Sequence, residues 1–132
     1  MLPWCHSWSV AISKEECKAS REGAPAALQA WLAKWAALGA LSRQAIESMV
    51  PVALLDVQPH HACLDMCGSP GSKTTQALEA LAPKGDTGAG GGGGYMVAND
   101  MVPARCQMLL RRCAARGELS SQLYLRSTLD LP

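Results

Sequence analysis

The sequence predicts an α/β protein in which half of a doubly wound parallel sheet follows a helical N-terminal region. Three observations predict this fold: helical patterns come first, short strand patterns then alternate with further helices, and a glycine-containing turn joins the first strand to its helix. Strand–helix–strand–helix–strand is the order of the βαβαβ unit of parallel sheets. We expect residues 1–58 to form the helical region and residues 59–132 to form an incomplete α/β domain.

Two apolar patterns with helical spacing precede the strands. The first is alanine-rich, is expected to begin near Pro25 and to end at Gly39, and has its large apolar residues on one face: Leu28, Trp31, Leu32 and Trp35. The second follows Ser42, a candidate helix cap, and has these residues on one face: Ile46, Met49, Val50, Ala53 and Leu54. Pro51 lies inside the second pattern, and we expect it to kink or divide that helix. We interpret both faces as packed core.

The stretch HACLDMCGSPGSKTTQ, residues 61–76, joins the first strand to a helix. Its apolar run Ala62–Met66 has the length of a strand, and the glycines and proline of residues 68–71 turn the chain, with Gly71 expected to let the backbone approach a ligand. A helix follows from about Ser72 to Leu81, with Ala77, Leu78 and Leu81 on its apolar side. We expect the N–H groups of the turn to be unpaired and to lie at the positive end of the helix dipole. This arrangement predicts a site for a ligand that carries negative charge.

The remaining elements follow a glycine-rich segment. Five consecutive glycines within residues 85–94 predict a surface loop, because glycine destabilises helices and strands. A second strand then ends at Asp100, a helix runs from Pro103 to about Arg116 and is ended by Gly117, and residues 122–127 form a third strand. On this helix we expect a buried side with Cys106, Leu109, Leu110 and Cys113, and an exposed side with Arg105, Arg111 and Arg112. Parallel strands present their carboxyl ends to ligands, so we expect Asp100 to face the ligand; capping of the next helix is the alternative.

Composition and charge limit the partners of the chain. The sequence is 48% hydrophobic but has no apolar run of the ~20 residues that a membrane span needs. Its first residues lack the basic region of a secretory signal, so we expect an intracellular protein, nuclear or cytoplasmic, with no membrane partner. The net charge is only +1. If the partner is RNA, most of the surface that holds it lies outside these residues.

The six cysteines are expected to be reduced and mostly buried, because the chain has no secretory signal: Cys5, Cys17, Cys63, Cys67, Cys106 and Cys113. His60 and His61 precede two of them, but the spacing matches no common zinc motif and adjacent residues of a strand point to opposite faces. We therefore expect no metal site.

Three kinds of ligand compete for the turn. A Walker A loop needs glycine immediately before the lysine and another at the start of the motif, where this chain has Ser72 and Cys67. The run from Gly68 to Gly71 also fails the G-x-G-x-x-G dinucleotide fingerprint. The third ligand is S-adenosylmethionine, with its amino-acid carboxylate at the turn and the hydroxyls of its ribose at Asp100.

Two motifs resemble a known family. CLDMCGSPGSKTTQ is similar to the first motif of the NSUN (Sun-domain) RNA cytosine-5 methyltransferases, which is close to LDxCAAPGGKT, and VANDMVPARCQMLL is similar to their second motif. The segment LSRQAIESMVPVALLDVQPHH resembles the one that precedes the sheet in the tRNA-modifying members. The resemblance covers about residues 41–130. It implies a partial Rossmann-like, S-adenosylmethionine-dependent methyltransferase fold that acts on RNA, with tRNA as the expected partner.

The resemblance also implies the cofactor contacts. They fall on the turn, on a ribose-binding acid and on a further acid near the adenine: Cys67, Gly68, Ser69, Pro70, Gly71, Ser72, Lys73, Asp100 and Asp130. Lys73 is in addition a candidate for an assisting role in catalysis. Gly68 and Ser69 replace the usual alanine pair, a change between small residues that should preserve the turn. The polyglycine tract is not a feature of the family and predicts a loop insertion.

One departure concerns the mechanism. The family uses two cysteines from later motifs, one of which follows a proline, and this chain contains no Pro-Cys pair. A thiolate that adds to carbon 6 of cytosine makes carbon 5 nucleophilic, and Cys67, in the cofactor turn, is not placed for that role. We expect the chain to carry the cofactor-binding half, to have no catalytic residue of its own and to be inactive alone. The alternatives are a truncated, inactive binding module and a P-loop-type nucleotide-binding protein.

Overall fold

The computed structural model describes residues 9, 13, 15–16, 23–82, 93–115 and 123–127. The chain divides into two units, Met1–Arg43 and Gln44–Pro132. The boundary expected after residue 58 stays a prediction, and the helix that precedes it lies in the second unit. Within the described ranges, no helix has the length and apolar character needed to cross a membrane.

The first unit contains the helix α2, Ala24–Ala37. Pro25 lies in its first turn, where the missing N–H costs no helical hydrogen bond, and the helix ends before Gly39, as predicted. The expected packing of its apolar face is wrong for the tryptophans: Trp31 is 53% exposed and Trp35 is 36% exposed. Their ring centroids lie 6.1 Å apart, so they contact each other at the surface of the helix.

The second unit begins with α3, Ile46–Leu54. The helix is continuous through Pro51, which removes one hydrogen bond but leaves its own carbonyl to accept the N–H of Leu55 at 3.1 Å. Of the two outcomes expected for Pro51, division of the helix is therefore wrong, and a kink stays a prediction. Ser42 is not its cap either, because the residue before the helix is Ala45 and no side chain caps it. The buried residue of α3 is Val52, whereas Leu54, placed on the packed face by the pattern, is 80% exposed.

Three parallel strands form the sheet, in the order β1-β2-β3. They are β1, Ala62–Asp65, β2, Tyr95–Asp100, and β3, Leu123–Ser127. Each agrees with its predicted strand to within one residue. The predicted α/β fold with a βαβαβ unit is confirmed, because α4, Ser72–Leu81, and α5, Pro103–Ala115, connect the strands.

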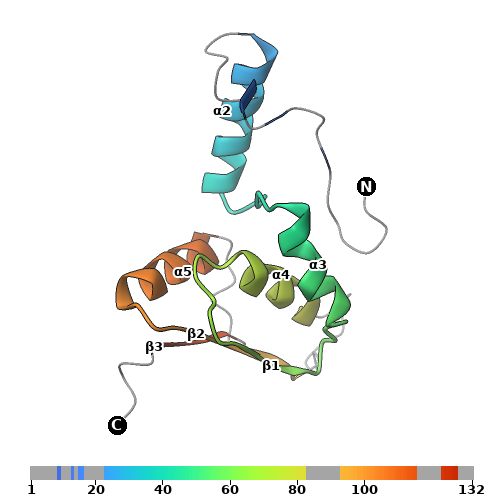
Figure 1. Cartoon of the computed structure of the whole chain (residues 1–132), viewed down its shortest axis with the longest axis vertical. Coiled ribbons are helices and arrows are strands. Elements are labelled where there is room, and N and C mark those ends of the chain that lie inside the picture. Colours follow the sequence, from blue (N-terminus) through green and yellow to red (C-terminus); the bar gives the residue numbers. More distant parts are fainter. Residues whose placement is uncertain are drawn as a thin grey trace. The chain divides into compact units, whose positions relative to one another are not determined.

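Both connecting helices cover the same face of the sheet (Figure 1). The core lies between them and the strands, and α3 adds to it: Val52, Ala77, Leu78, Leu81, Met96, Ala98, Leu109 and Cys113. The predicted apolar side of α4 is thus buried, while Leu110 of α5, expected on the buried side, is exposed. On β2 the buried and less buried residues alternate, which points Asp100 to the same face as Met96 and Ala98.

The described part of the glycine-rich segment is its end. Gly94 is buried and donates its N–H to the carbonyl of Pro59 at 3.0 Å, so it closes the start of β2 against the segment before β1. Residues 85–92 of the loop predicted over 85–94, the helix stop at Gly117 and the acid Asp130 lie outside the described residues.

Candidate cofactor site at the carboxyl ends of β1 and β2

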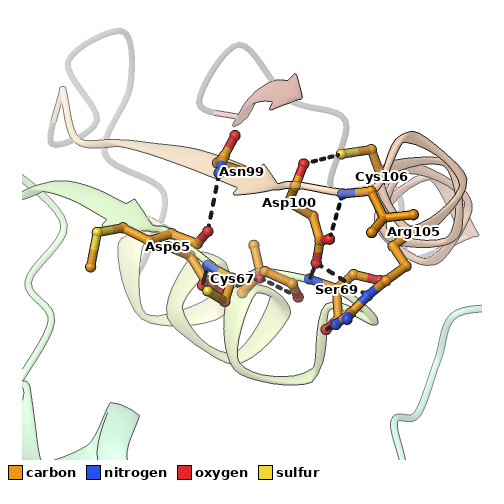
Figure 2. Close-up of polar contacts among 11 residues, drawn as sticks. Asp65, Cys67, Ser69, Asn99, Asp100, Arg105 and Cys106 are labelled. Carbon is orange, nitrogen blue, oxygen red and sulfur yellow. Dashed lines mark hydrogen bonds and ion pairs between the residues drawn. The ribbon is translucent and has the colours of Figure 1, made fainter. Parts of the chain in front are cut away.

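Two acids mark the site, one at the end of each neighbouring strand (Figure 2). Asp65 ends β1 and Asp100 ends β2. The parallel register pairs Asp65 with Ala98, so β2 runs two residues farther, toward the turn that follows β1. Residues 66–71 form this turn, and α4 begins directly after it at Ser72.

The carboxylate of Asp65 accepts hydrogen bonds from both sides of the turn. Its Oδ1 accepts the N–H of Cys67 at 3.2 Å, and its Oδ2 accepts the hydroxyl of Thr74 at 2.7 Å. One carboxylate therefore ties the end of β1 to the first turn of α4. The sequence prediction did not include Asp65 or Thr74. An aspartate two residues before a turn N–H is a recognisable signal, because this residue type commonly accepts that hydrogen bond.

Asp100 contacts the same turn from the side of β2. Its side chain is almost wholly buried, at 4% exposed. Its Oδ2 accepts the N–H of Ser69 at 3.3 Å, and its Oδ1 accepts the N–H of Val102 at 3.1 Å. The second contact is a local turn with the residue before α5, so Asp100 does not cap an N–H of the helix itself, which was the alternative expected from the sequence. Asp100 makes it in addition to its contact with the turn, so the predicted acid does lie beside the predicted bend.

Arg105 of α5 joins the two parts of the site. Its Nη2 donates to the carbonyl of Ser69 at 2.9 Å, and its Nε lies 3.4 Å from Oδ2 of Asp100. The guanidinium thus bridges turn and strand end, as Figure 2 shows. The sequence placed Arg105 only on the exposed side of its helix. The side chain is half exposed even while it bridges the two groups. The helical spacing of the sequence therefore cannot distinguish this arginine from one that is simply solvated.

The turn satisfies most of its own N–H groups, which corrects the expectation that they are unpaired. Besides the two carboxylate contacts, Gly68 donates to the carbonyl of Asn99 at 2.8 Å and Gly71 donates to that of Gly68 at 2.7 Å. A turn packed between two strand ends must pair its buried donors, because unpaired ones are costly. The first N–H groups of α4, those of Ser72, Lys73 and Thr74, have no acceptor within the helix, which begins its backbone bonding with Thr75 donating to Gly71 at 2.9 Å.

Gly71 is required by the fold itself, and the predicted close approach of its backbone to a ligand stays a prediction. Its φ is +97°, a left-handed conformation that favours glycine. A Cβ at this position would lie 2.8 Å from Cδ1 of Leu109, so α5 fills the space beside it. The peptide bond between Ser69 and Pro70, one residue earlier in the turn, is cis. Backbone conformation and helix packing therefore fix this glycine.

The structure brings the predicted turn residues and Asp100 together and divides them by exposure. Cys67, Pro70 and Lys73 are exposed, whereas the buried members form the floor: Gly68, Ser69, Gly71 and Asp100. Ser72 is half-buried at the start of α4. Asp130 lies outside the described residues, so its place at the site stays a prediction.

The four described cysteines form no disulfide and lie in different surroundings. Cys67 is exposed in the turn, Cys63 is half-buried on β1 and Cys113 is buried in the core. Burial raises the pKa of Cys63, which lowers its thiolate fraction. Cys106 is half-buried and donates its thiol to the carbonyl of Asp100 at 3.3 Å. Among the described residues no group of three or more possible metal ligands occurs, and the expected lack of a metal stays a prediction.

A hollow of about 330 Å³ lies elsewhere, along the start of β1. It is lined by Leu55, Val57, His61, Ala62, Cys63 and Leu64. Its lining includes no acid and no helix N-terminus, and it follows β1 only from Ala62 to Leu64, before the turn. The convergence of charged and polar groups at the carboxyl ends of the strands therefore makes that edge the better candidate site.

Sequence comparisons find relatives among enzymes that modify tRNA, although no protein-family model matches the chain. It is 38% identical over 114 residues to the multisite-specific tRNA:(cytosine-C(5))-methyltransferase of Saccharomyces cerevisiae, covering 84% of this chain and 16% of that protein. It is 36% identical over 121 residues to the corresponding Schizosaccharomyces pombe protein trm4b, covering 85% and 18%. A tRNA (cytosine(34)-C(5))-methyltransferase of Drosophila melanogaster is 45% identical over 76 residues, covering 56% and 10%.

A solved structure shares the fold. NSun6 from Pyrococcus horikoshii, determined with SFG, superposes with a TM-score of 0.60 at 23% identity, over 72% of this chain and 22% of that one. The chain spans less than a fifth of the length of the three relatives.

Proposed function

Because this chain belongs to the NSUN family of RNA cytosine-5 methyltransferases, we propose that it forms the S-adenosylmethionine-binding half of such an enzyme, with tRNA as substrate. The chain spans a small part of its relatives, so the activity of a whole enzyme is part of the proposal. An intracellular location is also part of the proposal, because tRNA is an intracellular substrate.

The observation that carries the proposal is the contact between Asp100 and the turn. An acid at the end of β2 lies 3.3 Å from a turn N–H after β1, which puts a carboxylate acceptor and a helix N-terminus at one edge of the sheet. A nucleoside with an amino-acid tail needs both: an acceptor for its ribose hydroxyls and positive potential for its carboxylate. The residues present fit such a group, since the floor also holds a buried hydroxyl with no partner, Ser69 Oγ.

Each end of the cofactor has its own residues in this proposal. Asp100 accepts a hydrogen bond from the ribose, and its burial keeps competing water away. The free N–H groups at the start of α4 meet the amino-acid carboxylate, and Lys73, exposed in the first helical turn, adds a full positive charge there. When bound, the cofactor supplies an electrophilic methyl group for transfer to carbon 5 of cytosine.

The thiolate that activates the cytosine comes, in this proposal, from outside the described cysteines. The Cys63 thiol has a raised pKa, Cys113 is sealed in the core and Cys106 donates to a backbone carbonyl. Cys67 is exposed, but it adjoins the cofactor turn rather than a separate pocket for a base. We propose that this chain alone binds the cofactor and transfers no methyl group.

The test is the affinity for S-adenosylhomocysteine, measured by calorimetric titration of the whole chain and of Asp100→Asn. Loss of the carboxylate removes a charge-assisted hydrogen bond, so the dissociation constant should rise about 10- to 100-fold. Glu47→Gln is the matched control, because it makes the same acid-to-amide change in the first turn of α3, away from the site. Equal affinity of Asp100→Asn and the unaltered chain would contradict the assignment, and no binding by the unaltered chain would contradict the function itself.

A further inference from the structure

Ser69 has a buried hydroxyl without a partner in the free protein. The residue is 6% exposed, and its Oγ is the one buried side-chain nitrogen or oxygen atom with no hydrogen bond among the described residues. Both backbone groups of the same residue are used: its N–H by Asp100 and its carbonyl by Arg105. The backbone is therefore held firmly while the side chain is left unsatisfied.

An unsatisfied buried hydroxyl lowers the stability of the free protein, and alanine at this position would remove that cost. The motif that this stretch resembles has an alanine pair where this chain has Gly68 and Ser69, so the fold does not need the hydroxyl. Groups that lower stability without contributing to packing are found preferentially at binding sites. The hydroxyl lies at such a site, one residue before the exposed Pro70 and next to Asp100.

The hydrogen bonds of Asp100 indicate what the hydroxyl binds. A carboxylate has about four acceptor positions, and three donors already occupy this one: the N–H groups of Ser69 and Val102 and the Nε of Arg105. About one position remains for a ligand. A ribose presents two neighbouring hydroxyls, so Asp100 in this arrangement accepts one of them and leaves the other without a partner.

Building on the proposed function, we propose that the hydroxyl of Ser69 binds the second ribose hydroxyl of the cofactor, beside the one that Asp100 accepts. A hydroxyl both donates and accepts, so it can pair with the ligand in either direction. Rotation about the Cα–Cβ bond moves Oγ between staggered positions, and contact with a ligand requires no change in the backbone bonds to Asp100 and Arg105. Ser69 is thus a specificity residue for an unmodified ribose.

The test compares Ser69→Ala with the unaltered chain, using S-adenosylhomocysteine and its 2′-deoxy and 3′-deoxy analogues as probes in calorimetric titrations. We expect Ser69→Ala to weaken S-adenosylhomocysteine about 5- to 20-fold and to bind one deoxy analogue as tightly as the unaltered chain does. Ser48→Ala, at a half-buried serine of α3, is the matched control. A thermal melt without ligand is the second readout: Ser69→Ala should melt at the same temperature as the unaltered chain or at a higher one.

Three results would overturn the inference. The first is an affinity of Ser69→Ala within twofold of the unaltered chain. The second is that Ser69→Ala weakens the binding of both deoxy analogues by the same factor as it weakens the binding of S-adenosylhomocysteine. The third is a lower melting temperature of the free variant, which would show that the hydroxyl has a structural role. Each of these three results leaves binding by the unaltered chain intact and so contradicts only the role of Ser69. If the unaltered chain does not bind S-adenosylhomocysteine at all, the proposed function itself fails.

Discussion

The helices α2 and α4 contain the same kind of apolar pattern, but the apolar side is buried on α4 and its tryptophans are exposed on α2. On α4 the predicted side is buried against β2, with Leu81 fully inaccessible, whereas on α2 both Trp31 and Trp35 are exposed. The difference lies in what the chain places opposite each helix. A crossover helix between two parallel strands must lie on the sheet, while α2 precedes the sheet and has no such constraint. Spacing determines which residues share a face, and topology determines whether that face is covered.

The largest expected effect tests this contrast through stability. Leu81→Ala should lower the free energy of unfolding by about 2–5 kcal/mol, because it leaves a cavity among Leu78, Met96 and neighbouring core residues. Trp31→Ala removes more atoms but from an exposed position, so we expect a loss below about 1 kcal/mol. Urea unfolding monitored by circular dichroism measures both. Similar losses for the two variants would mean that α2 is covered in solution.

A second pair of variants separates the turn from the body of α4. Thr74 and Thr75 are both fully buried, but Thr74 donates to Asp65 across the turn, and Thr75 donates to the carbonyl of Gly71 within its own helix. Thr74→Val keeps the shape and leaves the carboxylate short of a donor, so it should cost about 1–3 kcal/mol. Thr75→Val should cost less, because its hydrogen bond only duplicates a backbone contact of that carbonyl. The same urea titrations decide the order, and a larger loss for Thr75→Val would contradict the role given to Asp65.

The smallest stability effect should come from exposed lysines on the same two helices. Lys34→Ala removes a cation 5.8 Å from the Trp35 ring, and Lys73→Ala removes one from the first turn of α4. Each change should alter stability by about 0.5 kcal/mol or less. Only Lys73→Ala should weaken S-adenosylhomocysteine, by about 3- to 10-fold and less at high salt. Equal affinities of the two variants in calorimetric titrations would remove Lys73 from the site.

The sequence predicted the sheet and its helices well because their signals are local. Short sequence signals mark where the elements begin: Gly71 precedes α4, Pro103 starts α5 and an apolar run forms β1. It also predicted that Asp100 meets the turn, since strand order alone brings the two together. The exposure of the tryptophans on α2 could not be predicted, because the burial of a helix face depends on which other segments cover it.

The interior bonding of the site was also beyond the sequence. Arg105 bridges Ser69 and Asp100 through a side chain whose position on an exposed helix face is shared by many solvated arginines. The pairing of the turn N–H groups depends on Asp65 and Asn99, which lie on different strands. Such contacts join segments distant in sequence, and periodicity carries no information about them.

The most direct measurement is a crystal structure of the chain with S-adenosylhomocysteine. The account predicts a ribose hydroxyl within hydrogen-bond distance of the Asp100 carboxylate and the amino-acid carboxylate at the start of α4. A ligand seated instead in the hollow beside Leu55 and Cys63, with Asp100 still enclosed by Ser69 and Arg105, would contradict it.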